Sequence, residues 1–133
     1  MSASNSVVPV QILLVDDDPA VREAVSEFLT DEGFTVRTAI NGADALAELA
    51  PPHERPALIL LDLAMPVMNG HELLRRITID PRLAPLPVLV LSATIDDVDA
   101  RPGVWLLRKP LESAALVRAI RVALATATAT PLS

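Results

Sequence analysis

Carboxylate, hydroxyl and ammonium side chains follow four separate apolar runs of this sequence. Carboxylates that lie close together raise one another's pKa unless a cation neutralises them. A hard divalent cation with oxygen ligands is their natural partner, and we expect Mg²⁺. The side chains concerned are Asp16, Asp17 and Asp18 after residues 10–15, Asp62 after residues 57–61, Ser92 after residues 88–91, and Lys109 after residues 104–107.

The single lysine strengthens this interpretation. Of the 11 basic residues only Lys109 is a lysine, and it stands directly before Pro110. A compact ammonium group suits one phosphoryl oxygen better than the planar fork of an arginine does. Lys109 could instead be an ordinary surface cation, but its position after an apolar run favours a role beside a phosphoryl group.

The segments between these residues alternate between strand-like and helical patterns. Residues 57–61 are continuously apolar, which is typical of a parallel strand covered on both faces. Residues 21–29 show the i, i+3, i+4, i+7 spacing of an amphipathic helix, with Asp18 as a predicted N-cap and Gly33 after its end. The expected strands are 10–15, 34–38, 57–62, 88–92 and 104–107, and the expected helices are 19–32, 42–50, one around 73–77 and 116–124.

A βα alternation of this kind predicts an α/β fold, a parallel sheet with helices on both faces. Ligands of such sheets bind beyond the carboxyl ends of the strands, where the polar residues above stand. We expect one domain at 10–125, with flexible ends at 1–9 and 126–133. The segment between Asp96 and Gly103 has little apolar periodicity and predicts a weak fourth helix.

Composition excludes several classes of function. The 133 residues fit one domain, and a net charge of −6 argues against binding to nucleic acid. The absence of cysteine removes disulfides and thiolate chemistry. No apolar run approaches the roughly 20 residues that a membrane span needs. We therefore expect a soluble cytoplasmic protein with no membrane or nucleic-acid partner.

Four motifs, in this order and spacing, resemble the receiver domains of bacterial two-component response regulators. Asp62 lies 45 positions after Asp17, and Ser92 lies 30 positions after Asp62. The resemblance covers residues 10 to 125 and implies a flavodoxin-like, doubly wound five-stranded sheet of order 2-1-3-4-5. The motifs are Ile12–Pro19, Asp62–Gly70, Val90–Ala93 and Arg108–Pro110.

The resemblance also implies a role for each residue of the site. Asp62 would be the phosphoacceptor, with Ser92 as the switch hydroxyl and Lys109 as the cation that pairs with the phosphoryl group. Asp17 would bind Mg²⁺ directly and Asp16 through a water molecule. The remaining implied features are Asp62 and the backbone carbonyl of Ala64 as metal ligands, space for the phosphoryl group at Ala93, and a cis bond before Pro110.

The implied function is that of a stand-alone phosphoacceptor signalling module. It would take its phosphoryl group from a sensor histidine kinase or a histidine phosphotransfer protein. It would then bind an unknown downstream protein or pass the group along a phosphorelay. It would be an enzyme only in catalysing its own phosphorylation and dephosphorylation.

Two features depart from the family. Lys109 follows Ser92 by only 17 positions, which predicts a shortened or irregular fourth helix. Leu106, three positions before the lysine, replaces the usual aromatic switch residue. Trp105 is its neighbour, and strand alternation puts the two on opposite faces. We expect residues 95–101 to be mobile and to become ordered on phosphorylation.

Two other functions remain open. Haloacid-dehalogenase-like phosphatases also use a strand-end aspartate, but they need an acid two positions later, where this chain has Ala64. A receiver-like domain that is never phosphorylated is the third possibility, and the complete set of acids with Ser92 and Lys109 argues against it. We assign no role to His53 or His71.

Overall fold

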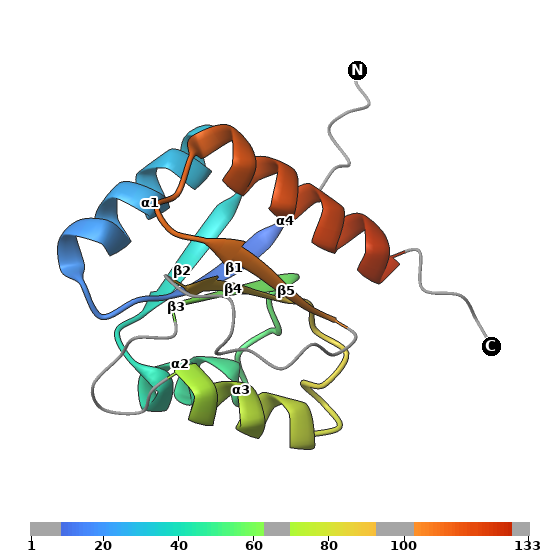
Figure 1. Ribbon diagram of the computed structural model, residues 1–133. Coiled ribbons are helices and arrows are strands. Elements are labelled where there is room, and N and C mark those ends of the chain that lie inside the picture. Colours follow the sequence, from blue (N-terminus) through green and yellow to red (C-terminus); the bar gives the residue numbers. More distant parts are fainter. Residues whose placement is uncertain (1–8, 63–69, 93–102, 129–133) are drawn as a thin grey trace.

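The computed structural model describes residues 9–62, 70–92 and 103–128. These residues contain five parallel strands that form one sheet of order β2-β1-β3-β4-β5 (Figure 1). The predicted α/β fold and strand order are therefore confirmed. The strands are β1 (Gln11–Val15), β2 (Thr35–Ala39), β3 (Leu58–Asp62), β4 (Val88–Ser92) and β5 (Val104–Arg108).

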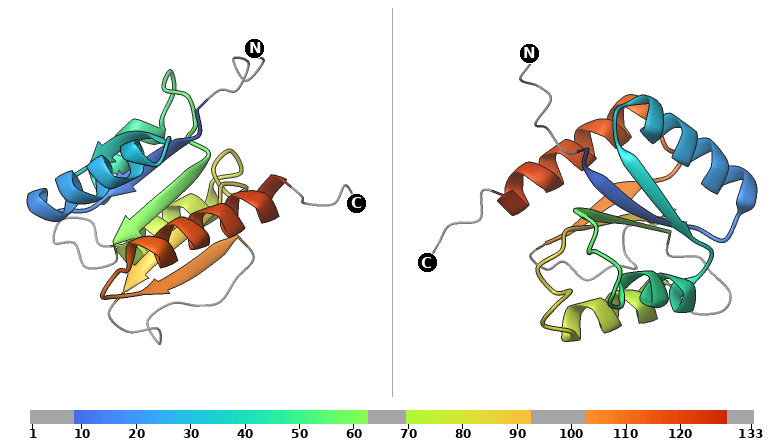
Figure 2. Two further views of the ribbon diagram at one scale, coloured as in Figure 1. Left: turned by 90° about the horizontal axis from the view of Figure 1, so that it is seen from above. Right: turned by 180° about the vertical axis from the view of Figure 1, so that it is seen from behind.

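Four described helices cover the two faces of the sheet. Helices α1 and α4 pack on one face, and α2 and α3 pack on the other, as two opposite views show (Figures 1 and 2). No helix among the described residues is long and apolar enough to cross a membrane. Their bounds are α1 (Pro19–Asp31), α2 (Gly42–Leu49), α3 (Gly70–Ile79) and α4 (Ser113–Thr128).

Local sequence signals place the helix ends. Asp18 caps α1, since its carboxylate accepts hydrogen bonds from the backbone N–H groups of Ala20 and Val21. Asn41 caps α2 in the same way. Gly33 follows α1 with a φ of 100°, the left-handed conformation that glycine adopts without steric cost. The predictions for Asp18 and Gly33 are thus confirmed.

Strand alternation divides the apolar residues into two cores. All five residues of β3 and of β4 are buried, as expected of central strands covered on both faces. Leu13, Ile59 and Val90 face α2 and α3, whereas Leu14 and Leu60 face α1 and α4. This rigid sheet fixes the positions at which its strands end.

The last helix ends later than the sequence pattern indicates. Helix α4 continues to Thr128, beyond the expected end of the folded domain at residue 125. Residues 126–128 lack an apolar pattern, but extending an existing helix costs far less than starting one. The predicted short or irregular, mobile segment at 95–101 lies outside the described residues, as do residues 1–8 of the predicted flexible end at 1–9 and residues 129–133 of the predicted flexible end at 126–133.

Candidate functional site

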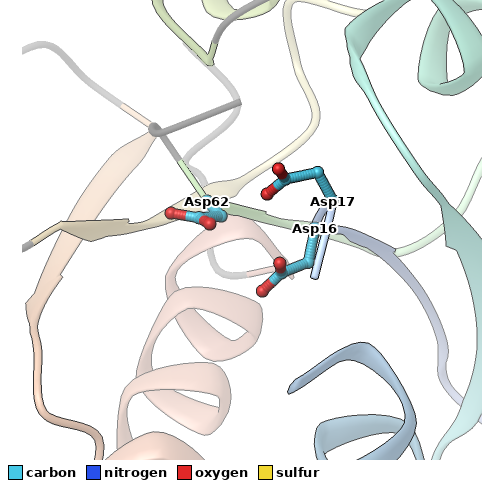
Figure 3. Close-up of side chains that lie close together, drawn as sticks. All are labelled: Asp16, Asp17 and Asp62. Carbon is cyan, nitrogen blue, oxygen red and sulfur yellow. The ribbon is translucent and has the colours of Figure 1, made fainter. Parts of the chain in front are cut away.

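The carboxyl ends of β1 and β3 bring three aspartates together. One carboxylate oxygen from each of Asp16, Asp17 and Asp62 lies within 4.8 Å of the other two. Figure 3 shows the three side chains side by side at these strand ends. Asp16 and Asp62 are only 1% and 5% exposed, and Asp17 is exposed. The cluster therefore combines two buried carboxylates with one that solvent reaches.

Lys109, the residue directly after β5, joins this cluster. Its Nζ lies 2.9 Å from Asp62 Oδ1, in an ion pair whose aspartate side is almost fully buried. The backbone N–H of Lys109 donates to the carbonyl oxygen of Ser92 at 2.9 Å, which ties the end of β5 to the end of β4. The Lys109–Pro110 bond is cis, as predicted. The single lysine of the chain is thus held against the buried Asp62.

Ser92 ends β4 at the same edge of the sheet. It is 6% exposed and pairs in register with Arg108 of β5. Asp62 in turn pairs in register with Leu91, the residue before Ser92. The structure therefore places Asp16, Asp17, Asp62, Ser92 and Lys109 at one edge, whereas Ala64 and Ala93 lie outside the described residues.

Burial makes the charged form of Asp16 costly. Desolvation raises the pKa of the Asp16 carboxyl above its ordinary value, and the nearby charges of Asp62 and Asp17 raise it further. The backbone N–H of Asp18, which donates to Asp16 Oδ1 at 2.9 Å, and the charge of Lys109 act in the opposite direction. A bound divalent cation would offset the repulsion between these carboxylates.

The donor set fits a hard cation. It consists only of carboxylate oxygens, and Lys109 pairs with one of the three acids, Asp62. Mg²⁺ prefers oxygen ligands and commonly takes one or two carboxylates together with water and phosphate oxygens. His53 and His71 are exposed and do not belong to the acidic cluster. The described residues therefore suit Mg²⁺ better than a metal that requires nitrogen or sulfur.

Arg22 is a member of this site that the sequence did not reveal. It lies in α1 and donates from Nη1 to the backbone oxygen of Asp16 at 2.9 Å. Its position, four residues after the N-cap Asp18, is the only sequence signal that could have indicated a contact with the preceding loop. Arginines on helices are common, so the signal alone was weak.

The two neighbours on β5 face opposite sides, as alternation predicted. Leu106 packs with the core beside α2 and α3, and Trp105 packs with the core beside α1 and α4. Trp105 pairs in register with Leu89, and Leu106 pairs with Val90. Trp105 therefore does not occupy the position of the aromatic switch residue.

Comparison with known proteins identifies a family. The family model described as "Response regulator receiver domain" matches residues 12–121. The CpxR homolog of Haemophilus influenzae, a transcriptional regulatory protein, is 39% identical over 119 residues, which are 86% of this chain and 50% of the relative. Protein PilH of Pseudomonas aeruginosa is 30% identical over 123 residues, 86% of this chain and 98% of PilH.

A solved structure agrees with this result. The chemotaxis response regulator CheY4 of Vibrio cholerae matches with a TM-score of 0.79 and 28% identity, over 87% of this chain and 99% of that one. The chain spans between 36% and 50% of the length of the first four curated relatives, all named as regulators. The matched region coincides with the sheet and helices that carry the acidic cluster.

Proposed function

The chain belongs to the response regulator receiver domain family, and from this premise we propose that Asp62 accepts a phosphoryl group in a Mg²⁺-dependent reaction. A receiver domain is a signalling domain of a two-component system. The observation that carries the proposal is the convergence of Asp62 with Asp16, Asp17 and Lys109 at one edge of the sheet. Burying a carboxylate beside two others and a lysine costs free energy, so this arrangement is better explained by a function than by a contribution to the stability of the fold.

In the proposed reaction a carboxylate oxygen of Asp62 attacks the phosphorus of a phosphohistidine. An O–P bond forms, the P–N bond breaks, and the imidazole keeps the electron pair and takes up a proton. The product on Asp62 is an acyl phosphate, a known form of carboxylate catalysis. When bound, Mg²⁺ would neutralise charge on the transferring oxygens. Asp16, Asp17 and Asp62 would hold it, with the carbonyl of Ala64 as a further proposed ligand.

Lys109 and Ser92 have separate roles in this proposal. Lys109 holds the Asp62 carboxylate in place before transfer and can pair with a phosphoryl oxygen afterwards, since an ammonium group has three donors. Ser92 ends the adjacent strand, where its hydroxyl can donate to the phosphoryl group. The two contacts with the phosphoryl group would form only in the phosphorylated state, and they would favour the conformation that a partner recognises.

We propose a sensor histidine kinase or a histidine phosphotransfer protein as the donor. The phosphorylated domain would then bind a downstream protein or pass the group on in a phosphorelay. A kinase draws on ATP, so we place the reaction in the cytoplasm. We expect no contact with nucleic acid or membrane by this domain, given the acidic net charge of −6.

Mass spectrometry tests the phosphoacceptor directly. Incubation with acetyl phosphate and Mg²⁺ should add one phosphoryl group, and Asp62→Asn should abolish it. Asp31→Asn, at the exposed end of α1, is the matched control and should be phosphorylated like the parent. Equal labelling of Asp62→Asn would contradict the proposal. Hydrolysis of a stable phosphate monoester such as p-nitrophenyl phosphate would indicate the phosphatase alternative, and no labelling would indicate a receiver that is never phosphorylated.

A further inference from the structure

Arg22 links helix α1 to the acidic cluster. Its guanidinium Nη1 donates to the backbone oxygen of Asp16 at 2.9 Å, in a partly buried hydrogen bond. The charged donor makes this bond stronger than one between neutral groups. Arg22 is itself partly buried, whereas its neighbour Glu23 on the same helix is exposed. The side chain is therefore directed at the site and not at solvent.

This contact closes a ring of hydrogen bonds around the first acid. Asp18 donates its N–H to Asp16 Oδ1 at 2.9 Å, and its carbonyl accepts the N–H of Arg22 at 2.8 Å. The N–H of Asp16 donates to the carbonyl of Ala39, the last residue of β2, at 3.1 Å. In this ring, the bond from Arg22 is the one that a substitution can remove while every acid stays in place.

The carbonyl that Arg22 holds belongs to the peptide group between Asp16 and Asp17. This peptide group is planar, so fixing its oxygen also fixes the orientation of the nitrogen of Asp17. The position of the Asp17 Cα atom, from which the side chain starts, follows from that orientation. Asp17 is the exposed member of the cluster, and repulsion from Asp16 and Asp62 would otherwise turn it toward solvent.

We propose that Arg22 is a positioning residue for the Mg²⁺ site. By holding the peptide between Asp16 and Asp17, it keeps the Asp17 carboxylate beside Asp62 before the cation binds. The inference rests on the proposed function for the identity of the cation. It goes beyond that function because it assigns the assembly of the site to a side chain of α1 that neither binds the metal nor touches the phosphoryl group.

The direction in which Arg22→Met changes the affinity for Mg²⁺ distinguishes a positioning role of Arg22 from an effect of its charge. Arg22 is a cation near the site, so its charge alone disfavours a second cation. If only charge mattered, Arg22→Met would make Mg²⁺ bind more tightly. If positioning matters, the same variant binds Mg²⁺ more weakly, because part of the binding free energy must then order Asp17.

The experiment is a MgCl2 titration at constant ionic strength, followed by the amide NMR shifts of Asp17 and Asp18. We expect Arg22→Met to raise the Kd for Mg²⁺ about tenfold, as the loss of one charge-assisted hydrogen bond implies. Arg22→Lys keeps the charge and a donor and should recover part of the affinity. Arg118→Met, an exposed arginine on α4, is the matched control and should bind Mg²⁺ like the parent.

Urea unfolding without Mg²⁺ is the second measurement. A purely structural role would lower the free energy of unfolding but leave the Kd of the folded variant unchanged, and that result would overturn the proposal. A Kd that falls, or a parent protein whose Asp17 amide does not respond to Mg²⁺, would overturn it as well. The titration needs no phosphoryl donor. A failure of Asp62 to accept a phosphoryl group would appear only in the mass-spectrometry experiment, so the two proposals can fail independently. If Arg22→Met does not fold, the Kd of Arg22→Lys for Mg²⁺ is compared with that of the parent. A higher Kd would support the proposal, and an equal Kd would contradict it.

Discussion

Lys109 forms an ion pair with Asp62, the proposed phosphoacceptor, and the shape of its cationic group should matter there. The two groups are 2.9 Å apart, and the Asp62 side chain is almost fully buried. We predict that Lys109→Arg lowers the rate of phosphorylation by acetyl phosphate roughly tenfold, although the charge is kept. The guanidinium fork is larger than an ammonium group and contacts oxygens in a different geometry.

Mass spectrometry over time measures this rate. Arg108→Lys is the matched control, because it makes the reverse exchange at the exposed neighbouring residue and should leave the rate unchanged. Parent-like phosphorylation of Lys109→Arg would mean that Lys109 contributes only its charge.

The acids, the hydroxyl and the lysine could be predicted from the sequence because each one stands within two residues of the end of an apolar run. A parallel sheet brings such residues to the same edge whatever the lengths of the intervening helices. Arg22 could not be predicted in this way. Its partner is a backbone carbonyl, which every residue carries, so no pairing of residue types marks the contact. The contact exists only once α1 has folded back beside the end of β1.

Among the elements, the start of α1 connects stability to the site. Asp18 accepts hydrogen bonds from Ala20 and Val21 and donates its own N–H to Asp16. We predict that Asp18→Ala lowers the free energy of unfolding by about 1 kcal/mol, as expected for the loss of an N-cap. The measurement is urea unfolding at neutral pH.

Asp31→Ala is the control for this prediction, because it removes the same side chain from the last residue of α1. An acid there opposes the helix dipole, so its removal should leave stability unchanged or slightly raised. Equal destabilisation by the two variants would contradict the assignment of Asp18 as the cap.

Helix α3 carries a pH-dependent contact on its exposed face. Hydrogen bonds from Arg75 and Arg76 lower the pKa of Glu72 to about 2, from an ordinary value of 4.5. A carboxyl whose pKa falls on folding stabilises the protein above its unfolded pKa and loses this contribution as the pH drops through its folded pKa. We predict that Glu72→Gln is less stable than the parent above pH 4.5, and that the difference vanishes between pH 4.5 and about 2.

Urea unfolding over a series of pH values checks the behaviour of Glu72. Both ion pairs of Glu72 are exposed to solvent. The difference in the free energy of unfolding should therefore be small, and it should shrink further in high salt. A difference that grows as the pH falls would show that Glu72 acts by some means other than these ion pairs.

At the scale of the whole molecule, the fold was predictable because two signals agree along the chain. The continuous apolar runs that became β3 and β4 require cover on both faces, and the helical segments between the strands provide it. The end of α4 was not predictable, since the Ala and Thr residues at 125–128 carry no apolar pattern and continue the helix by propagation. Apolar patterns in a sequence indicate which residues are buried. They therefore do not predict where a helix ends when its last turn is not buried.

The acidic cluster should also couple the stability of the whole domain to Mg²⁺. Three carboxylates within 4.8 Å repel one another in the folded protein, and unfolding separates them. A cation that binds only the folded state raises the free energy of unfolding by RT ln(1 + [Mg²⁺]/Kd). We predict an increase of about 1.4 kcal/mol at ten times the Kd, measured by urea unfolding with ionic strength held constant.

Asp17→Ala provides the comparison, because it removes the exposed ligand and leaves the buried Asp16 and Asp62 in place. Without Mg²⁺ this variant should be at least as stable as the parent, since one repulsive charge is gone. With Mg²⁺ it should gain far less than the parent, because its affinity for the cation is lower. If Asp17→Ala gained as much stability from Mg²⁺ as the parent, the cation would be binding elsewhere, and the acidic cluster would not be the metal site.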